Sequence, residues 1–261
     1  IHGYKIASPS FILFLEKITH SSFEELEAMG GVSKKRIKEV TISAAILKSL
    51  LELGETNFII FSAFGIREGC IFKNLSPEMQ KKDPLLITCE KIASSTRRFT
   101  LTSDELENWA LPLFRNLDKH NRRLLKAACI LSDFAWADHP SYRAEQAFLR
   151  ILRLPAIGLT HDDRVFLALT ILVRYGGNLT YLELEKWNEV ISRERLYIAL
   201  KIGAAIRLGI TLSAGLDGLL HQIEMVKNKK IITIRYAPEV ILISRETITQ
   251  KVENLSKYFN C

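Results

Sequence analysis

A long stretch of helical periodicity sets the strongest limit on the fold of this chain. From Leu85 to about Met225, nearly every segment has the apolar spacing of an amphipathic helix, and no segment stands out as a strand. The spacing predicts helices over 84–98, 103–116, 119–136, 142–153, 161–175 and 193–210. We therefore expect an all-α domain in the middle of the chain.

The segment before this domain combines helices with a short β-rich run. A helix predicted from Ser33 ends at Gly54, and its apolar residues share one face that we expect to be buried. These residues are Ile42, Ala45, Ile46, Leu50 and Leu53. The following stretch, TNFIIFSAFG, is predicted to be a strand buried on both faces. A helix followed by such a strand is typical of an α/β layer, so residues 1–74 predict part of a parallel or mixed sheet domain.

The end of the chain departs from the helical pattern again. The stretch KIITIRYAPEVILIS holds two β-rich runs around Ala237 and Pro238, and RETITQKVENLSKYF has the spacing of an amphipathic helix. These residues predict a β-hairpin with a closing helix docked on it. The chain is thus predicted to be α+β, mainly α, with domains at 1–74, 75–225 and 226–261.

Charge, cysteine usage and hydropathy narrow the partners and the compartment. The net charge of +7 favours anionic partners, but the basic runs lack interleaved aromatic residues, so nucleic acid is not expected. No run of about eighteen uncharged apolar residues exists, and the start IHGYKIASPS lacks the order of a signal peptide. The cysteines have no CxxC spacing, which indicates free thiols: Cys70, Cys89, Cys129 and Cys261. We expect a soluble cytoplasmic protein without a membrane partner.

The stretch FSAFGIREGC runs from the predicted strand into Gly65, Arg67, Glu68 and Gly69. Open α/β sheets bind their ligands at the carboxyl ends of strands. Glycines let backbone amides approach an anion, an arginine offers a planar fork that matches phosphate oxygens, and the adjacent glutamate can orient that arginine. The stretch therefore indicates a phosphate-facing loop. A turn stabilised by a local ion pair is the alternative.

A longer segment around this loop, GVSKKRIKEVTISAAILKSLLELGETNFIIFSAFGIREGCIF, resembles the exopolyphosphatase and guanosine pentaphosphate phosphatase family. The helical stretches RRLLKAACILSDFAWADHPSYRAEQAF and HDDRVFLALTILVRYGG are similar to its α-proteobacterial branch. The likeness spans nearly the whole chain. In the first segment, the positions that match are Gly31, Arg36, Ser62, Gly65, Arg67, Glu68 and Gly69.

The resemblance implies an actin-like, ribonuclease H-like fold in two lobes, followed by a helical domain related to the HD phosphohydrolases. It implies release of the terminal phosphate of inorganic polyphosphate or guanosine pentaphosphate, with Mg²⁺ in the cleft between the lobes. The catalytic carboxylate and the metal-binding acids of the family lie before the part matched here. We therefore expect this chain to be the end of the second lobe plus the helical domains, without catalytic residues or metal ligands. The expected substrate-binding residues are Gly65, Arg67, Glu68, Gly69 and Arg36.

A second cluster of polar residues lies in LSDFAWADHPSYRAEQ, which contains Asp133 and His139. HD domains bind a metal through a His-Asp pair and further His and Asp residues, but here Ser132 precedes Asp133 and the downstream segment reads RYGG. One Asp and one His do not make a metal site. We expect Asp133 and His139 to hold a helix junction by hydrogen bonds, with Trp136 and Tyr142 in the core.

The remaining histidines show no pairing with a carboxylate on one helix face that would suggest a ligand or a base, so they are expected to be caps and surface residues. They are His2, His20, His120, His161 and His221. Two functions stay open. The first is the C-terminal portion of an exopolyphosphatase-type hydrolase. The second is a non-catalytic helical module that binds phosphorylated ligands or mediates homodimerisation.

Overall fold

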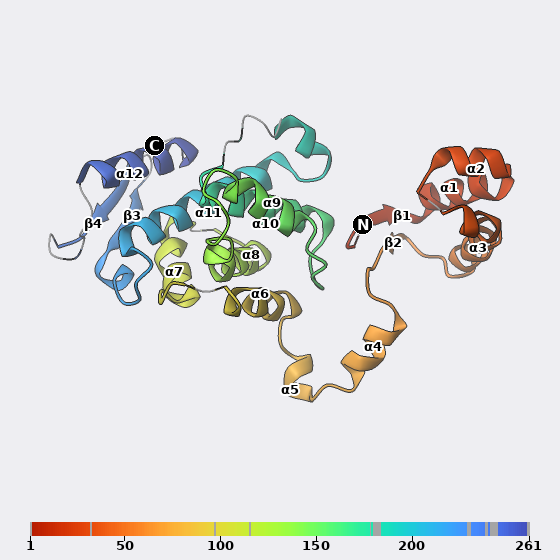
Figure 1. Cartoon of the computed structure of the whole chain (residues 1–261), viewed down its shortest axis with the longest axis horizontal. Helices are drawn as coiled ribbons and strands as arrows, with labels where there is room; N and C mark the ends of the chain where they lie inside the picture. The colour runs from red at the N-terminus through yellow and green to blue at the C-terminus, as the bar shows by residue number, and fades with distance from the viewer. Residues whose placement is uncertain are drawn as a thin grey trace. The chain divides into compact units, whose positions relative to one another are not determined.

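The computed structural model describes residues 2–31, 33–96, 98–114, 116–177, 179, 184–228, 231–237, 240 and 245–259. The chain divides into two compact units, Ile1–Gly69 and Cys70–Cys261. Both are mainly helical, and each contains one small antiparallel sheet (Figure 1). The predicted α+β class, mainly α, is confirmed at this level. The segment 226–261, predicted as a separate domain, belongs to the second unit.

The first unit is a pair of short strands joined through three helices. Its elements are β1 (Lys5–Ala7), α1 (Ser8–His20), α2 (Phe23–Met29), α3 (Lys34–Leu53) and β2 (Phe58–Ile60). Helix α2 begins with a capping box, in which Ser22 and Glu25 accept hydrogen bonds from each other's backbone amides. The core residues come from the three helices: Phe11, Leu15, Ile18, Leu26, Ile37 and Ala44.

The sheet of the first unit differs from the prediction. Strands β1 and β2 pair antiparallel, with Ile6 opposite Ile59, and the described residues of this unit contain no third strand. Phe58 and Ile60 are 56% and 65% exposed, whereas Ile59 packs against the core. Side chains alternate between the faces of a strand, and only one face of this pair packs on the core. The expectation of a strand buried on both faces is therefore wrong for this unit.

The buried face of α3 also differs from the prediction. Ile37 and Ala44 are buried, and Val40 and Leu51 pack against the same core. The five apolar residues predicted to be buried are exposed, and Leu53 reaches 83%. Helix α3 has apolar residues on two faces, and α1 and α2 pack against the face that carries Ile37. The prediction from periodicity alone assigned the other apolar face of α3 to the core.

The second unit begins with α4 (Ile66–Lys73), which crosses the boundary, and α5 (Pro77–Gln80). All six helices predicted for its centre are present, with shifts of a few residues at their ends. They are α6 (Pro84–Ser94), α7 (Ser103–Ala110), α8 (Lys119–Ile130), α9 (Arg143–Leu152), α10 (His161–Arg174) and α11 (Arg193–Ser213). Side-chain caps start most of them; Asp83, for example, accepts hydrogen bonds from the first amides of α6.

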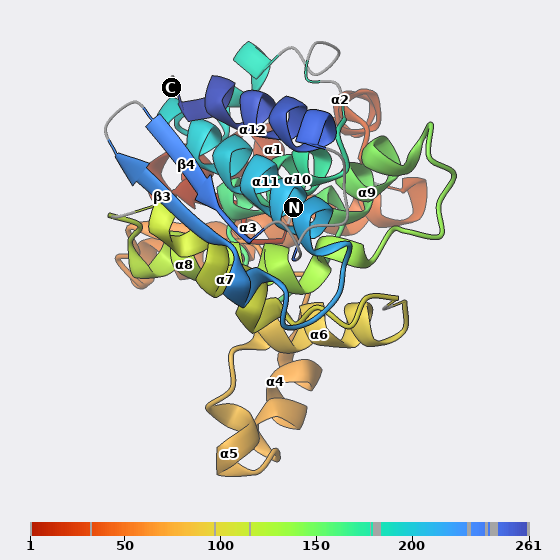
Figure 2. The same cartoon turned by 90° about the vertical axis from the view of Figure 1, so that its left-hand side faces the viewer.

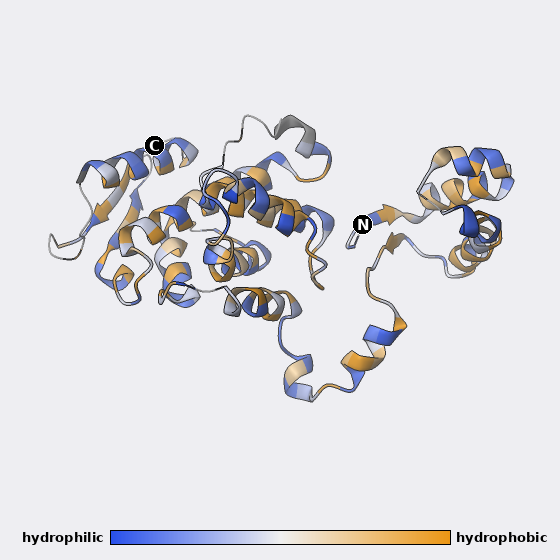
Figure 3. Ribbon diagram, viewed as in Figure 1, coloured by the Kyte–Doolittle hydropathy of each residue, from blue (hydrophilic) through white to orange (hydrophobic). Residues whose placement is uncertain are grey.

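Helices α10 and α11 form the centre of this unit. Every residue from Asp163 to Arg174 is buried, and hydrophobic colour follows α10 and α11 along much of their length in Figure 3. The two helices meet at Gly203, where a Cβ atom would come within 2.4 Å of the Thr170 carbonyl oxygen. Helix α11 is long and apolar enough to span a membrane by length and composition, but most of it is buried in this core. Its hydropathy is that of a core helix.

The hairpin at the end of the chain is formed by β3 (Glu224–Asn228) and β4 (Ile231–Arg235), which pair antiparallel. Figure 2 shows them side by side, with α12 (Arg245–Phe259) along α11. The first predicted run is β4, and it pairs with β3, a strand that was not predicted. At the predicted turn, the Val240 amide donates to the Ala237 carbonyl over 3.0 Å. Residues 238–239 and 241–244 lie outside the described residues, so a strand after Pro238 stays a prediction.

Candidate functional site

The structure places the predicted phosphate loop at the start of α4. Gly65 precedes this helix, and Arg67, Glu68 and Gly69 lie in its first turn. The Gly65 amide donates a hydrogen bond to Glu68 Oε2 over 2.6 Å, so Glu68 closes the start of its own helix. The Arg67 side chain is exposed. The orienting role expected for Glu68 toward Arg67 stays a prediction.

Arg36, the fifth predicted substrate residue, lies in the first turn of α3. Its backbone amide donates to the Ser33 carbonyl over 2.8 Å, and its side chain is exposed. Within the described part of the first unit, no hydrogen bond or ion pair joins Arg36 to Arg67 or Glu68. The structure thus brings Gly65 and Glu68 together and leaves Arg36 apart from them.

Asp133 lies in a buried turn directly after α8. Its carboxylate accepts a hydrogen bond from the Arg98 backbone amide over 3.0 Å and another from Arg98 Nη2 over 3.4 Å. The predicted junction role is therefore confirmed for Asp133. His139 accepts a local bond from the Ser141 amide. Trp136 and Tyr142 are 37% and 61% exposed, so their predicted place in the core is wrong.

The region around Asp133 is rich in positive charge. Arg174, at the end of α10, is buried, and its guanidinium lies 4.6 Å from the centre of the Tyr175 ring. Burial lowers the pKa of Arg174 to about 10, and the charges of Arg207 and Arg98 act in the same direction. Among the described residues, no group of three His, Cys, Asp or Glu side chains could hold a metal ion. The absence of a metal stays a prediction.

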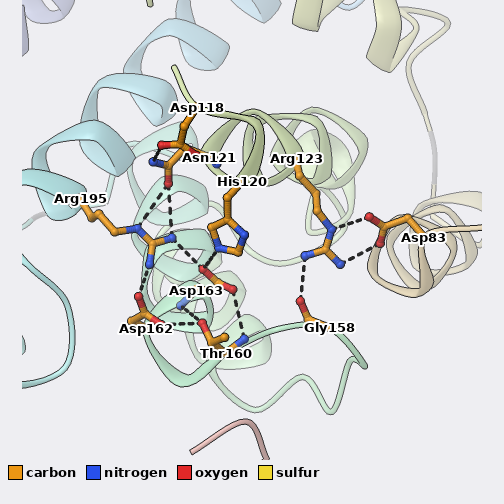
Figure 4. Close-up of polar contacts among 10 residues, drawn as sticks. All are labelled: Asp83, Asp118, His120, Asn121, Arg123, Gly158, Thr160, Asp162, Asp163 and Arg195. Atoms are coloured by element: carbon orange, nitrogen blue, oxygen red, sulfur yellow. Dashed lines mark hydrogen bonds and ion pairs between the residues drawn. The ribbon is translucent and has the colours of Figure 1, made fainter. Parts of the chain in front are cut away.

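A polar network joins the starts of α8, α10 and α11 (Figure 4). At its centre lies Asp163, which is fully buried and accepts three hydrogen bonds. Its donors are His120 Nε2 at 2.6 Å, Arg195 Nη2 at 2.7 Å and the Thr160 amide at 3.1 Å. Thr160 and Asp163 also form the capping box that starts α10.

Hydrogen bonding decides the charge state of Asp163. Burial alone would raise the pKa of this carboxyl. The bonds from Arg195, His120 and Thr160 outweigh burial, so the pKa lies below its ordinary value. Asp163 is therefore ionised at neutral pH and serves as the fixed negative charge of the network.

Arg195 extends the network to its neighbours. Its guanidinium contacts Asp162 as well as Asp163, and it donates to Asn121 Oδ1 over 3.3 Å. Asn121 in turn donates its backbone amide to Asp118, the cap of α8. Arg195 therefore ties the starts of three helices together.

A second arginine, Arg123, connects neighbouring elements of the same unit. In Figure 4, Arg123 on α8 lies between Asp83 and the loop at Gly158. Its guanidinium contacts both Asp83 oxygens, and Nη1 donates to the Gly158 carbonyl over 2.8 Å. Bonding to Arg123 holds the pKa of Asp83 below its ordinary value. This pair connects α6 to α8 and to the loop before α10.

The His120–Asp163 pair has the form of an acid–base dyad, in which a carboxylate orients an imidazole. His120 is 49% exposed at its side chain, so the ring can reach solvent. A nucleophile would have to bond to its other nitrogen. Among the described residues, no hydroxyl or thiol contacts His120. The network holds helix starts together, and no set of reacting groups is assembled around it.

Sequence reasoning missed this network, because His120 and Asp163 are 43 residues apart. It treated His120 as a cap or surface residue, yet the ring contacts a buried carboxylate. The available signal was the T-x-x-D pattern of Thr160 and Asp163, which marks a helix start. That pattern locates Asp163 but not its distant partners.

The described residues define a helical unit closed by a hairpin and a terminal helix, in which buried charges brace helix ends. Residues 86–258 match the family model described as "Exopolyphosphatase, C-terminal". The chain belongs to this family. It is also 27% identical over 206 residues to "Retrograde regulation protein 2" of Saccharomyces cerevisiae, covering 74% of this chain and 34% of the yeast protein. The chain thus spans about a third of the length of this curated relative.

Proposed function

We propose that this chain is the C-terminal portion of an exopolyphosphatase-type phosphoanhydride hydrolase. The intact enzyme would release terminal phosphate from inorganic polyphosphate or guanosine pentaphosphate. The observation that carries the proposal is the family match, which covers residues 86–258. The net charge of +7 supports it, because a polyanionic substrate is attracted to a basic protein.

Within such an enzyme, this chain would bind substrate and leave the reaction to other residues. The described residues do not fit Mg²⁺: Arg98 bonds to both Asp133 oxygens, and no group of three possible ligands is present among them. The metal ligands and the catalytic acid would come from an actin-like lobe outside this chain. Arg67 would contact the phosphates, since its side chain is exposed at the start of a helix, where the dipole also favours anions.

Two measurements on the purified chain test this proposal. It should bind long-chain polyphosphate in a salt-dependent way, and it should release no phosphate from polyphosphate with Mg²⁺ present. Arg67→Ala should weaken binding by about tenfold, because a charge-assisted hydrogen bond is lost. Lys73→Ala, at the other end of the same helix, is the matched control.

Each arm can contradict the proposal. Robust Mg²⁺-dependent release by this chain would place reacting groups inside it. Equal affinity for polyphosphate and for DNA of matched charge would indicate general attraction of polyanions. An unchanged affinity in Arg67→Ala would show that Arg67 does not bind polyphosphate, and the start of α4 would then have only a structural role.

A second candidate function is homodimerisation without chemistry, and the exposed face of α3 favours it. Ile42, Ile46, Leu50 and Leu53 are all more than half exposed along this helix. Exposed apolar surface of this kind marks a contact with another protein. Sedimentation of the chain over a range of concentrations tests this candidate, and a monomer at every concentration would exclude it. A cytoplasmic location also stays a prediction.

A further inference from the structure

The second unit contains a basic cavity that no step of the proposed reaction uses. It has a volume of about 400 Å³ and lies between the end of α10, the middle of α11 and α12. Figure 2 shows α12 running along α11 in this region. The polar side chains of its wall are Arg207, Lys251, Asn254, Lys257 and Tyr258.

The cations of this cavity have no acidic partner within the described part of the chain. No Asp or Glu lines the wall, and no ion pair or hydrogen bond of the Arg207 guanidinium or the Lys251 ammonium is present there. Lys257 contacts only the Asn254 amide oxygen, at 3.5 Å. Arg207 and Lys251 lie close enough for the charge of one to act on the other, and Lys257 adds a third positive charge to the wall. Like charges repel one another, and a bound anion would relieve that repulsion.

The Arg207 side chain is held in place by close packing. The Arg207 guanidinium lies directly against Gly176, where a Cβ atom would come within 2.5 Å of Arg207 Nη2. Gly176 has a φ of +78°, so both its conformation and its missing side chain suit the position. Lys251 is half-buried, and this burial, followed by the nearby charge of Arg207, lowers its pKa.

The rest of the wall is apolar. Val173, Ala204, Leu208 and Leu255 contribute to it, together with the ring of Tyr258. Apolar atoms, which include the carbon stems of the lysines and the arginine, supply more of the exposed wall than polar atoms do. Inorganic phosphate would contact only the cationic end, whereas an organic phosphate would also cover the apolar surface. Cavities of about 300 Å³ or more are large enough for small organic ligands.

We propose that this cavity binds an organic phosphate of roughly mononucleotide size. Its phosphate dianion contacts Arg207, Lys251 and Lys257, and its aromatic or apolar part packs against the half-buried ring of Tyr258. An arginine fork beside two lysines matches the geometry and charge of a phosphate group. The proposal goes beyond the proposed hydrolysis and does not depend on it, because the site needs neither a metal nor a reacting group.

Calorimetric titration of the purified chain tests the proposal with four probes. Phenyl phosphate and AMP carry the full chemistry, inorganic phosphate carries only the anion, and adenosine carries only the ring. We expect phenyl phosphate or AMP to bind at least tenfold more tightly than inorganic phosphate, and adenosine not to bind. Arg207→Gln and Lys251→Gln should each weaken binding about tenfold, as expected for losing one charge-assisted contact.

The control is Lys91→Gln, which removes the same charge from an exposed position on α6. It should bind like the parent. Because Arg207 is partly buried, a thermal melt checks that each variant is folded. If Arg207→Gln is unfolded, the binding result for Lys251→Gln decides the test. Absent or equal binding of all four probes at millimolar concentration would overturn the proposal. Binding that the Lys251 change leaves intact would also overturn it, and so would a preference for inorganic phosphate.

Discussion

Asp163→Asn should destabilise the second unit strongly, and the size of the effect follows from the network. Breaking a buried ion pair by removing one partner costs about 3–5 kcal/mol. Part of that cost is avoided here, because Arg195 keeps its contacts with Asp162 and Asn121, and His120 can turn to water. The capping bond to Thr160 is weakened as well. We expect a loss of about 2–3 kcal/mol.

Thermal unfolding measures this loss. For a domain of about 150–250 residues, each kcal/mol lowers Tm by about 2–4 °C, so Tm should fall by about 4–12 °C. Asp162→Asn is the matched control, since Asp162 contacts the same Arg195 from a more exposed position. Its cost should stay within about 1 kcal/mol. Equal losses in the two variants would show that burial does not set the strength of the network.

The stability difference between the parent and Asp163→Asn should depend on pH. The pKa of Asp163 is lower in the folded protein than its ordinary value, so the unfolded state binds the proton more tightly. The ionised carboxylate therefore contributes stability above its unfolded pKa of about 3.9. That stability is lost as the pH falls through the folded value. The difference between parent and Asp163→Asn should shrink below about pH 4, and a constant difference down to lower pH would refute the role assigned to this charge.

Two other predictions test the packing of the second unit. Gly203→Ala should cost about 1–3 kcal/mol in thermal or urea unfolding, because its methyl group would overlap the Thr170 carbonyl between α10 and α11; a neutral effect would mean that these helices can separate cheaply. A thiol reagent followed by peptide mapping should label exposed Cys70 quickly, whereas Cys89 is buried and burial raises its pKa to about 12. Equal labelling of both thiols in the folded protein would contradict the described core.

The helices of the second unit were predictable because their signals are local. Apolar spacing, together with a capping residue, fixes a helix within a window of about 15 residues. Thr160 starts α10 and Ser192 starts α11, each with a side chain that accepts a bond from a later amide. These features need no knowledge of the rest of the chain. Their predicted positions agree with the structure to within a few residues.

The errors arose where a choice depended on distant partners. Helix α3 offers two apolar faces, and packing against α1 and α2 selects the face with Ile37 and Ala44. The hairpin shows the same limit, because Met225 in β3 is buried and pairs with Ile234, although its surroundings EMVKN are largely polar. The sequence of β3 therefore predicts a strand less strongly than the run after Pro238 does. Residues 224–228 form a strand because they pair with β4.

The candidate sites divide in the same way. The residues around Gly65 and Glu68 are close in sequence, so a motif could locate them, and the structure shows them in contact. Asp163 and its donor Arg195 are 32 residues apart, and Arg207 and Lys251 come from two different helices. Only the packing of α10, α11 and α12 brings such residues together. No spacing rule within one segment predicts them.

We expect the region around Asp133 to suit anions better than metal ions, because of the charges that surround it. A divalent cation needs several anionic or neutral ligands, but Asp133 is neutralised by Arg98. Arg174 is buried nearby, and its lowered pKa records the positive charges of Arg207 and Arg98 as well as its burial. Arg174 thus lies near one carboxylate, Asp133, and two other arginines, Arg98 and Arg207, so the local charge is positive. A cation entering here would be repelled, whereas an anion near Arg207 would be attracted by the same field.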